Sequence, residues 1–345
     1  MTNTIFPWHE SAWRELQKFG QRLPHAILFH GTEGTGKTAF VEQFAQSLLC
    51  EKPLTEQRAC GVCDACGWFA QYSHPDFRRV RPEALDDDGE AESDGVETPD
   101  DTKKSAKSTK APSKEIKIDQ IRGLADFMNV STHRQGKRVV ILYPAEALNT
   151  AASNALLKML EEPPPDTVFL LVSNSLDRLL PTILSRCRKF ALSMPDGAQA
   201  LAWLSTQGIA SPESWLAEQG GAPLAALEQA QAGNRDGLDA LLTYLSAPSV
   251  EGALKTAEQC AKTPVVHLVG WSQRWLYDLF SYKLSGRIRY YPRYQSAFAK
   301  LAKQVEVGSL MQVAKAFDER RAIANHPLSA KLFIEDMLLS YSAMY

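Results

Sequence analysis

The sequence lacks any run of eighteen apolar residues, and residues 1–13 contain neither the basic segment nor the apolar segment of a secretory signal. These absences predict a cytoplasmic protein with no membrane partner. A basic excess is also missing, because 38 Lys and Arg residues face 40 Asp and Glu residues and the net charge is -2. A protein that holds nucleic acid by its overall charge is therefore excluded, and any DNA contact must be local or shared with partners.

Cysteine is scarce but unevenly placed. Only six cysteines occur in 345 residues, a length typical of two or three domains, and four of them lie between positions 50 and 66. Such a cluster suggests disulfides in a short secreted chain, but metal in a long cytosolic one. The spacing C-x9-C-x2-C-x2-C predicts a closed, structural Zn²⁺ site with four thiolate ligands. Its predicted ligands are Cys50, Cys60, Cys63 and Cys66, whereas Cys187 and Cys260 are expected to be small core residues.

One segment lacks a globular pattern. Ten acidic residues and no Lys or Arg occur between Glu83 and Asp101, and the next thirteen residues hold five lysines and no acid. Residues 83–114 therefore cannot bury a core and are predicted to be a disordered insertion. A DNA-binding arm is disfavoured, because the acidic block carries twice the charge of the basic one.

Elsewhere, short apolar runs alternate with helical patterns. The runs at 26–29, 139–142 and 168–172 are almost entirely apolar, which is typical of parallel strands covered on both faces by helices. After about Leu192 only helical patterns remain, with a weak boundary near 233–237. The sequence therefore predicts an α/β domain at 1–192, a small helical domain at 193–235 and a C-terminal helical domain at 236–345.

A complete G-x-x-x-x-G-K-T motif follows the first predicted strand and precedes a predicted helix. Glycines let backbone N–H groups turn toward phosphate, and the helix N-terminus adds a positive dipole. The lysine would reach the β and γ phosphates and the threonine would hold Mg²⁺. The predicted nucleotide-binding residues are Gly31, Gly34, Gly36, Lys37 and Thr38.

Residues for ATP hydrolysis are missing. A P-loop ATPase also needs a carboxylate at the end of a neighbouring strand to hold Mg²⁺, usually with a second to activate water. The strand at 138–142 runs instead into Tyr143 and Pro144. Glu146 lies two residues too far along, so a capping or surface role in the following helix is favoured over a role as base. ATP and Mg²⁺ are therefore expected to bind without hydrolysis.

Two further motifs complete a recognisable set: Asn-Ala-Leu-Leu-Lys-Met-Leu-Glu-Glu-Pro-Pro at 154–164, and Leu-Ser-Arg-Cys at 184–187. With the P-loop, the cysteine module and His-Pro-Asp at 74–76, they resemble the clamp-loader branch of the AAA+ ATPases, and within it the delta prime family of bacterial DNA polymerase III. The motifs span most of residues 1–192. The helical remainder is similar only in layout and in Asn-His-Pro-Leu at 325–328.

The resemblance implies a five-stranded parallel sheet with an inserted zinc module, a helical lid domain and a helical collar domain. It implies a heteropentamer with gamma/tau motor subunits and a delta subunit, which opens the sliding clamp and places it on primed DNA. Arg186 would be an arginine finger, offered in trans to the ATP site of a neighbouring subunit. The lid arginine of active motors is replaced by Leu224. A component of the polymerase holoenzyme without ATPase activity of its own is therefore expected.

Two alternative functions have less support in the sequence. A catalytically active AAA+ clamp-loader ATPase would be favoured by a carboxylate at position 143 or 144, and neither position has one. A zinc-dependent DNA-binding module would need a basic cluster around the cysteines. Such a cluster is not present, because two acids balance two basic residues there: Asp64 and Glu51 against Arg58 and Lys52.

Overall fold

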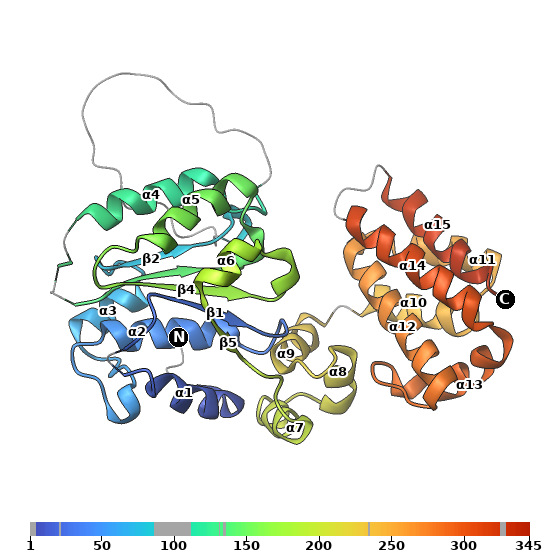
Figure 1. The fold of residues 1–345 in the computed structure, drawn as a ribbon. Coiled ribbons are helices and arrows are strands. Elements are labelled where there is room, and N and C mark those ends of the chain that lie inside the picture. Colours follow the sequence, from blue (N-terminus) through green and yellow to red (C-terminus); the bar gives the residue numbers. More distant parts are fainter. Residues whose placement is uncertain are drawn as a thin grey trace, which may run out of the picture. The chain divides into compact units, whose positions relative to one another are not determined.

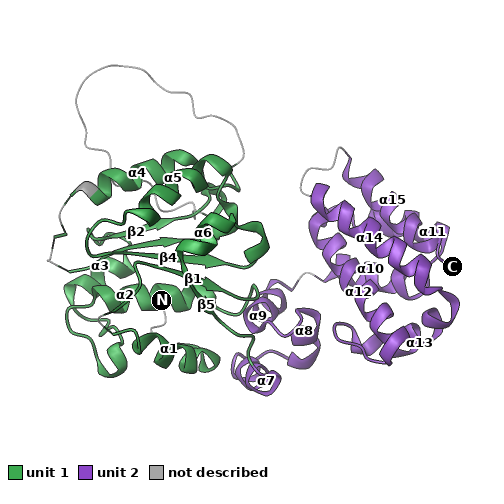
Figure 2. Cartoon of the chain, in the orientation of Figure 1, with its two compact units in different colours: residues 1–195 green, residues 196–345 purple. Residues whose placement is uncertain are grey.

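The computed structural model describes residues 5–20, 22–85, 112–130, 132–133, 136–233, 235–324 and 329–345. The chain divides into two units, residues 1–195 and residues 196–345 (Figure 2). The motif at 325–328 lies outside the described residues, as does most of the predicted insertion at 83–114. Among the helices of the described residues, none is long and apolar enough to cross a membrane.

The first unit is built on a five-stranded sheet with the order β2-β3-β4-β1-β5, in which every neighbouring pair is parallel. Every residue of β3 and β4 is buried. This burial explains why those strands read as continuous apolar runs, and it confirms the predicted α/β fold with a five-stranded parallel sheet. The strands are β1 (Ala26–His30), β2 (Phe77–Val80), β3 (Arg138–Leu142), β4 (Thr167–Ser173) and β5 (Arg188–Ala191).

Helices cover both faces of this sheet (Figure 1). Ile27 and Phe29 of β1 pack with α1, α2 and α3, whereas Ala26 and Leu28 pack with α4, α5 and α6, because successive strand residues point to opposite faces. One face carries α1 (Glu10–Gln17), α2 (Lys37–Leu49) and α3 (Asp64–Ala70). The other carries α4 (Ile118–Asn129), α5 (Thr150–Glu161) and α6 (Pro181–Arg186).

Both ends of the predicted insertion are fixed by one acidic side chain. Glu83 lies in a short 3-10 helix, Glu83–Leu85. One of its carboxylate oxygens accepts a hydrogen bond from the backbone N–H of Ser113 at 3.1 Å, and the other accepts one from Lys117 Nζ at 2.7 Å. These contacts bring the two ends of the segment together, and the predicted disorder between them stays a prediction.

The described part of the second unit is entirely helical, with separate apolar clusters in α7–α9 and in α10–α15. The first three helices are α7 (Gly197–Thr206), α8 (Pro212–Glu218) and α9 (Pro223–Ala232). The others are α10 (Asp236–Ser246), α11 (Val250–Gln259), α12 (Val265–Ser285), α13 (Gln295–Gln304), α14 (Val307–Ile323) and α15 (Ala330–Ser342). The division of this region into a lid at 193–235 and a collar at 236–345 stays a prediction.

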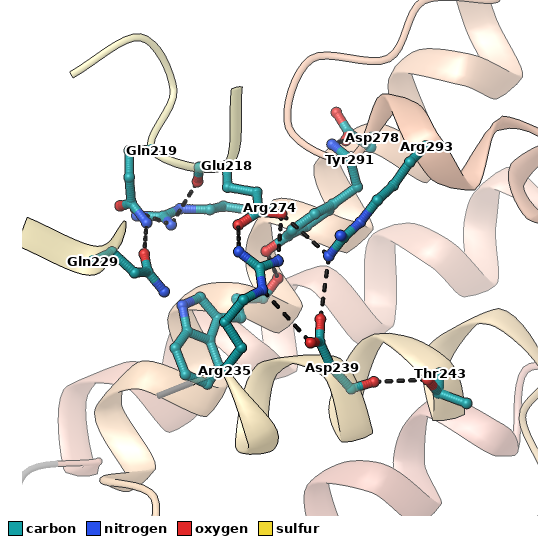
Figure 3. A network of polar contacts seen from close by, with 11 residues as sticks. Glu218, Gln219, Gln229, Arg235, Asp239, Thr243, Arg274, Asp278, Tyr291 and Arg293 are labelled. Carbon is teal, nitrogen blue, oxygen red and sulfur yellow. Dashed lines mark hydrogen bonds and ion pairs between the residues drawn. The ribbon is translucent and has the colours of Figure 1, made fainter. Parts of the chain in front are cut away.

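A buried carboxylate connects the two helical clusters of the second unit (Figure 3). Glu218 is the last residue of α8, and its side chain is 4% exposed. Arg235 donates two hydrogen bonds to it, at 2.8 and 3.0 Å, and Arg293 lies 3.2 Å from the same carboxylate. Arg274 of α12 donates to the Glu218 carbonyl at 2.8 Å. Because this charge is buried and paired with charges from other segments, it connects α8 to the bundle that follows.

We expect Glu218→Gln to weaken this connection, because two guanidiniums lose their buried counter-charge and keep the partly exposed Asp239 as a charged partner. Breaking one side of a buried ion pair costs about 3 kcal/mol, and the partial exposure of Arg293 places this case at or below that value. Hydrogen exchange of the α8 amides measures the loss as a lower opening free energy. Glu213→Gln, an exposed change in the same helix, is the control. Equal effects of the two variants would contradict the prediction.

Candidate functional site

The P-loop connects β1 to α2 in the first unit, as the sequence predicts. Gly36 is the N-cap of α2 and has a φ of 87°, a left-handed conformation that favours glycine. At Gly31, any Cβ atom would collide with the backbone carbonyl oxygen of Leu192, the residue after β5. The loop therefore needs glycine at Gly36 for its left-handed backbone conformation, and at Gly31 for the close approach of the Leu192 carbonyl. This backbone fits the cradle that a nucleotide phosphate needs.

Lys37 is buried at the first position of α2. Its Nζ donates to the carbonyl oxygen of Thr32 at 2.6 Å, and the hydroxyl of Thr35 donates to the same oxygen at 2.9 Å. Burial lowers the pKa of Lys37 to about 8, and the nearby carboxylates of Glu33 and Glu146 offset part of that shift. The ammonium group is thus held inside its own loop, where a bound anion would stabilise its charged form.

An N-terminal segment that the sequence reasoning missed packs against this loop. Trp8 Nε1 donates to the backbone carbonyl of Thr35 at 2.9 Å. The ring of His9 lies 5.0 Å from the ring of Phe40 in α2. Neither His9 nitrogen has a hydrogen-bond partner among the described residues. Burial, with the positive charge of Lys37, lowers the pKa of His9 to about 4, so this imidazole is neutral. The sequence signal for this packing is the group of aromatic side chains at residues 6–9.

The end of β3 has the composition that the sequence predicts. Tyr143 and Pro144 follow this strand directly, and burial raises the pKa of the Tyr143 phenol. Of the capping or surface role predicted for Glu146, the capping part is wrong, because α5 begins at Thr150 and its N-cap is Asn149, which accepts a hydrogen bond from a backbone N–H at 2.9 Å. Glu146 is half-buried and instead accepts a hydrogen bond at 3.0 Å from the backbone N–H of Asn174, just beyond β4.

Four cysteine sulfurs converge after α2, as the spacing predicts. Cys50 follows α2, and Cys66 lies within α3. The sulfurs of Cys50 and Cys63 are 3.9 Å apart, as are those of Cys60 and Cys66, and all four lie within 4.8 Å of one another. All four are free thiols. Four thiolates bound to Zn²⁺ at about 2.3 Å in a tetrahedron would have sulfurs about 3.8 Å apart, so this cluster fits a structural zinc ion.

The electrostatics of the cluster favour deprotonation at one position. Backbone N–H groups of Val62 and Cys63 lower the pKa of Cys60 to about 6. Burial raises the pKa of Cys50 and of Cys66. Cys187 and Cys260 are both buried away from this cluster and are fully explained as core residues, as expected.

Arg186 is the last residue of α6, and its side chain is one-third exposed. Its Nη1 donates to the carbonyl oxygen of Thr182 at 3.0 Å, and its Nη2 lies 2.5 Å from a carboxylate oxygen of Glu161. Helix α6 packs on the face of the sheet opposite α2, which carries Lys37. The structure therefore brings the P-loop and the cysteine cluster to the two ends of one helix, α2, and leaves Arg186 on the other layer.

The chain matches the family described as "DNA polymerase III, delta subunit" over residues 8–196. The delta prime subunit of DNA polymerase III from Pseudomonas aeruginosa is 36% identical over 292 residues, covering 81% of this chain and 79% of that protein. Its counterpart from Escherichia coli K12 is 32% identical over 252 residues, covering 71% and 67%. The tau subunit from Escherichia coli K12 is 31% identical over 178 residues, covering 52% of this chain and 23% of that protein.

The match to the family extends over more than half of the chain, and the Pseudomonas aeruginosa relative is similar over four-fifths of it. The family match covers the region that holds the P-loop, the cysteine cluster and Arg186. The chain therefore belongs to the delta prime family of DNA polymerase III subunits.

Proposed function

We propose that this chain is a non-hydrolysing subunit of the DNA polymerase III clamp loader, which helps to load the sliding clamp onto primed DNA. Its role is to offer Arg186 to the ATP site of a neighbouring gamma/tau motor subunit in a pentamer that also contains a delta subunit. The observation that carries the proposal is the guanidinium of Arg186 at the exposed end of α6, on the layer opposite the chain's own α2. A finger in that position suits an ATP site on another chain.

The residues after β3 support the absence of hydrolysis. A phenol and an imino acid, Tyr143 and Pro144, stand where a Mg²⁺-holding carboxylate is needed. One observation favours the alternative, an active ATPase. Glu146 lies near enough to Lys37 for its negative charge to raise the pKa of that lysine. Oε1 of this carboxylate is hydrogen-bonded to the backbone beyond β4, and Oε2 is buried without a partner among the described residues. No second acid accompanies it in the 3-10 helix Ala145–Ala147. ATP binding without turnover is the function that these residues favour.

We expect one Zn²⁺ per chain, bound by Cys50, Cys60, Cys63 and Cys66. Structural zinc contributes on the order of 10 kcal/mol to local folding, so Cys63→Ser should lower the zinc content and speed hydrogen exchange in residues 50–77 first. Metal analysis of the freshly purified chain measures the stoichiometry. Cys260→Ser, a buried cysteine in the other unit, should keep the zinc. A wild-type content well below one ion per chain would refute this site.

Nucleotide affinity should fall as the pH rises above about 8. The pKa of Lys37 is about 8 in the free chain, and a bound phosphate would raise it, so binding takes up a proton above that pH. The dissociation constant of ATP should then increase toward tenfold per pH unit between about pH 8 and 10. Titration calorimetry at several pH values measures this slope, and the same samples should show no ATP hydrolysis.

The control for this slope is Lys37→Arg, which stays charged throughout that range and should remove the pH dependence. An equal slope in the variant would assign the titration to another group. Steady hydrolysis abolished by Lys37→Ala would establish the active ATPase instead, and no binding by the wild-type chain would mean that the loop holds no nucleotide.

Replacing Arg186 by alanine should lower DNA-stimulated ATP hydrolysis and clamp loading by the assembled complex. A finger is worth roughly 10³ to 10⁵ in rate at the site that it serves, but the other motor sites keep their own arginines, so total hydrolysis should fall less than loading. Arg188→Ala, an exposed change two residues away, is the matched control. Unchanged loading by complexes that contain the Arg186 variant would refute the proposed role.

A further inference from the structure

The guanidinium of Arg186 is held by groups from two different helices. Nη1 donates to the carbonyl oxygen of Thr182 at 3.0 Å and to the hydroxyl of Ser185 at 3.4 Å, both within α6. Nη2 forms an ion pair of 2.5 Å with Glu161, the last residue of α5. Of these three contacts, the one with Glu161 therefore connects the guanidinium to a helix other than its own.

The backbones that carry this pair are rigidly placed. Leu156 and Leu160 of α5 and Ile183 of α6 are buried together in the apolar cluster on one face of the sheet. Each charged residue thus ends a helix whose apolar side is fixed by the same core. A side chain as long as arginine would otherwise sample many rotamers at an exposed helix end, so an anchored carboxylate restricts where its guanidinium points.

The stability of α5 does not explain a carboxylate at this place. Glu161 is at the C-terminal end of the helix, where the macrodipole disfavours negative charge, and its side chain is 48% exposed. Glu162, the next residue, is also exposed and makes no ion pair with the described residues. Of these two adjacent acids, only Glu161 is directed at the arginine.

The arginine can hold Glu161 and a second anion together. A guanidinium has five N–H donors in a planar fork, and the contacts with Thr182, Ser185 and Glu161 use only its two Nη groups. The ion pair is partly exposed, so it orients the guanidinium without removing it from solvent. A phosphoryl group that approaches from a neighbouring subunit would accept hydrogen bonds from the N–H donors that these three contacts leave over.

We propose that Glu161 is the positioning residue for Arg186, which orients its guanidinium toward the phosphoryl group of a nucleotide held by a neighbouring subunit. This inference rests on the proposed function, because it needs Arg186 to act in trans. Glu161 itself touches no nucleotide. Its effect must therefore pass through the arginine, and must disappear when the arginine is removed.

The test uses the full complex, assembled with wild-type chain, Glu161→Gln, Arg186→Ala or the double variant. The quantity compared is the part of the DNA-stimulated ATPase rate that Arg186→Ala removes. Glu161→Gln should lower this part about three- to fivefold, which is the size of one partly exposed ion pair. The loss should appear in kcat with little change in KM for ATP, because ground-state binding of the nucleotide does not involve Glu161. Glu161→Asp should restore part of the rate.

Two controls separate positioning from a structural role. Glu162→Gln makes the same chemical change one residue away and should match the wild-type rate. In the Arg186→Ala background, Glu161→Gln should cause no further loss, as the coupling of the two residues requires. A loss in that background would assign Glu161 to the folding of α5, and would overturn the proposal.

The remaining outcomes are also decisive. If Arg186→Ala lowers the rate and Glu161→Gln does not, the positioning role is wrong and the proposed function stands. If Glu161→Gln raises the rate, the carboxylate restrains the arginine, and the proposal is again overturned. If Arg186→Ala has no effect on hydrolysis or loading, the proposed function itself fails, and the role of Glu161 fails with it.

Discussion

The parallel alignment of the five strands is the constraint on which the rest of the first unit depends. Parallel strands bring their carboxyl ends to one edge of the sheet, so the P-loop after β1, Tyr143 after β3, Asn174 after β4 and Leu192 after β5 all lie along it. The close approach of the Leu192 carbonyl to Gly31 shows how tightly two of these ends meet. This topology brings the side chains at the strand ends around the P-loop, and those side chains decide whether a bound nucleotide could be hydrolysed.

Helix α2 connects the P-loop at this edge to the cysteine cluster at the other end of the helix. Lys37 occupies its first position, and Cys50 follows its last residue. The cysteine cluster therefore extends a helix whose other end forms the phosphate cradle, and a zinc ion there would stabilise the segment between α2 and α3. In the proposed function the cradle binds nucleotide, whereas Tyr143 and Pro144 after β3 supply no carboxylate for turnover.

Charge pairs at helix ends have different roles in the two units. Glu218 is almost completely buried, and its arginine partners come from outside its own helix, so this charge connects two helical clusters. Glu161 and Arg186 are partly exposed, so their pairing contributes little to stability and leaves the guanidinium accessible. The buried contacts of Glu218 therefore support the fold, whereas the partly exposed pair of Glu161 and Arg186 is available to a partner.

The α/β class, three of the five strands, the P-loop and the four-cysteine cluster are predictable from the sequence, because continuous apolar runs and fixed local spacings encode them. The edge strands β2 and β5 carry Arg and Lys among few apolar residues, so no apolar run indicated them. Local sequence patterns do not indicate the contacts of Trp8 with the P-loop, of Glu161 with Arg186, or of Arg235 and Arg293 with Glu218. These contacts join residues far apart in the chain, and the packing of the sheet and helices, rather than any local pattern, brings them together.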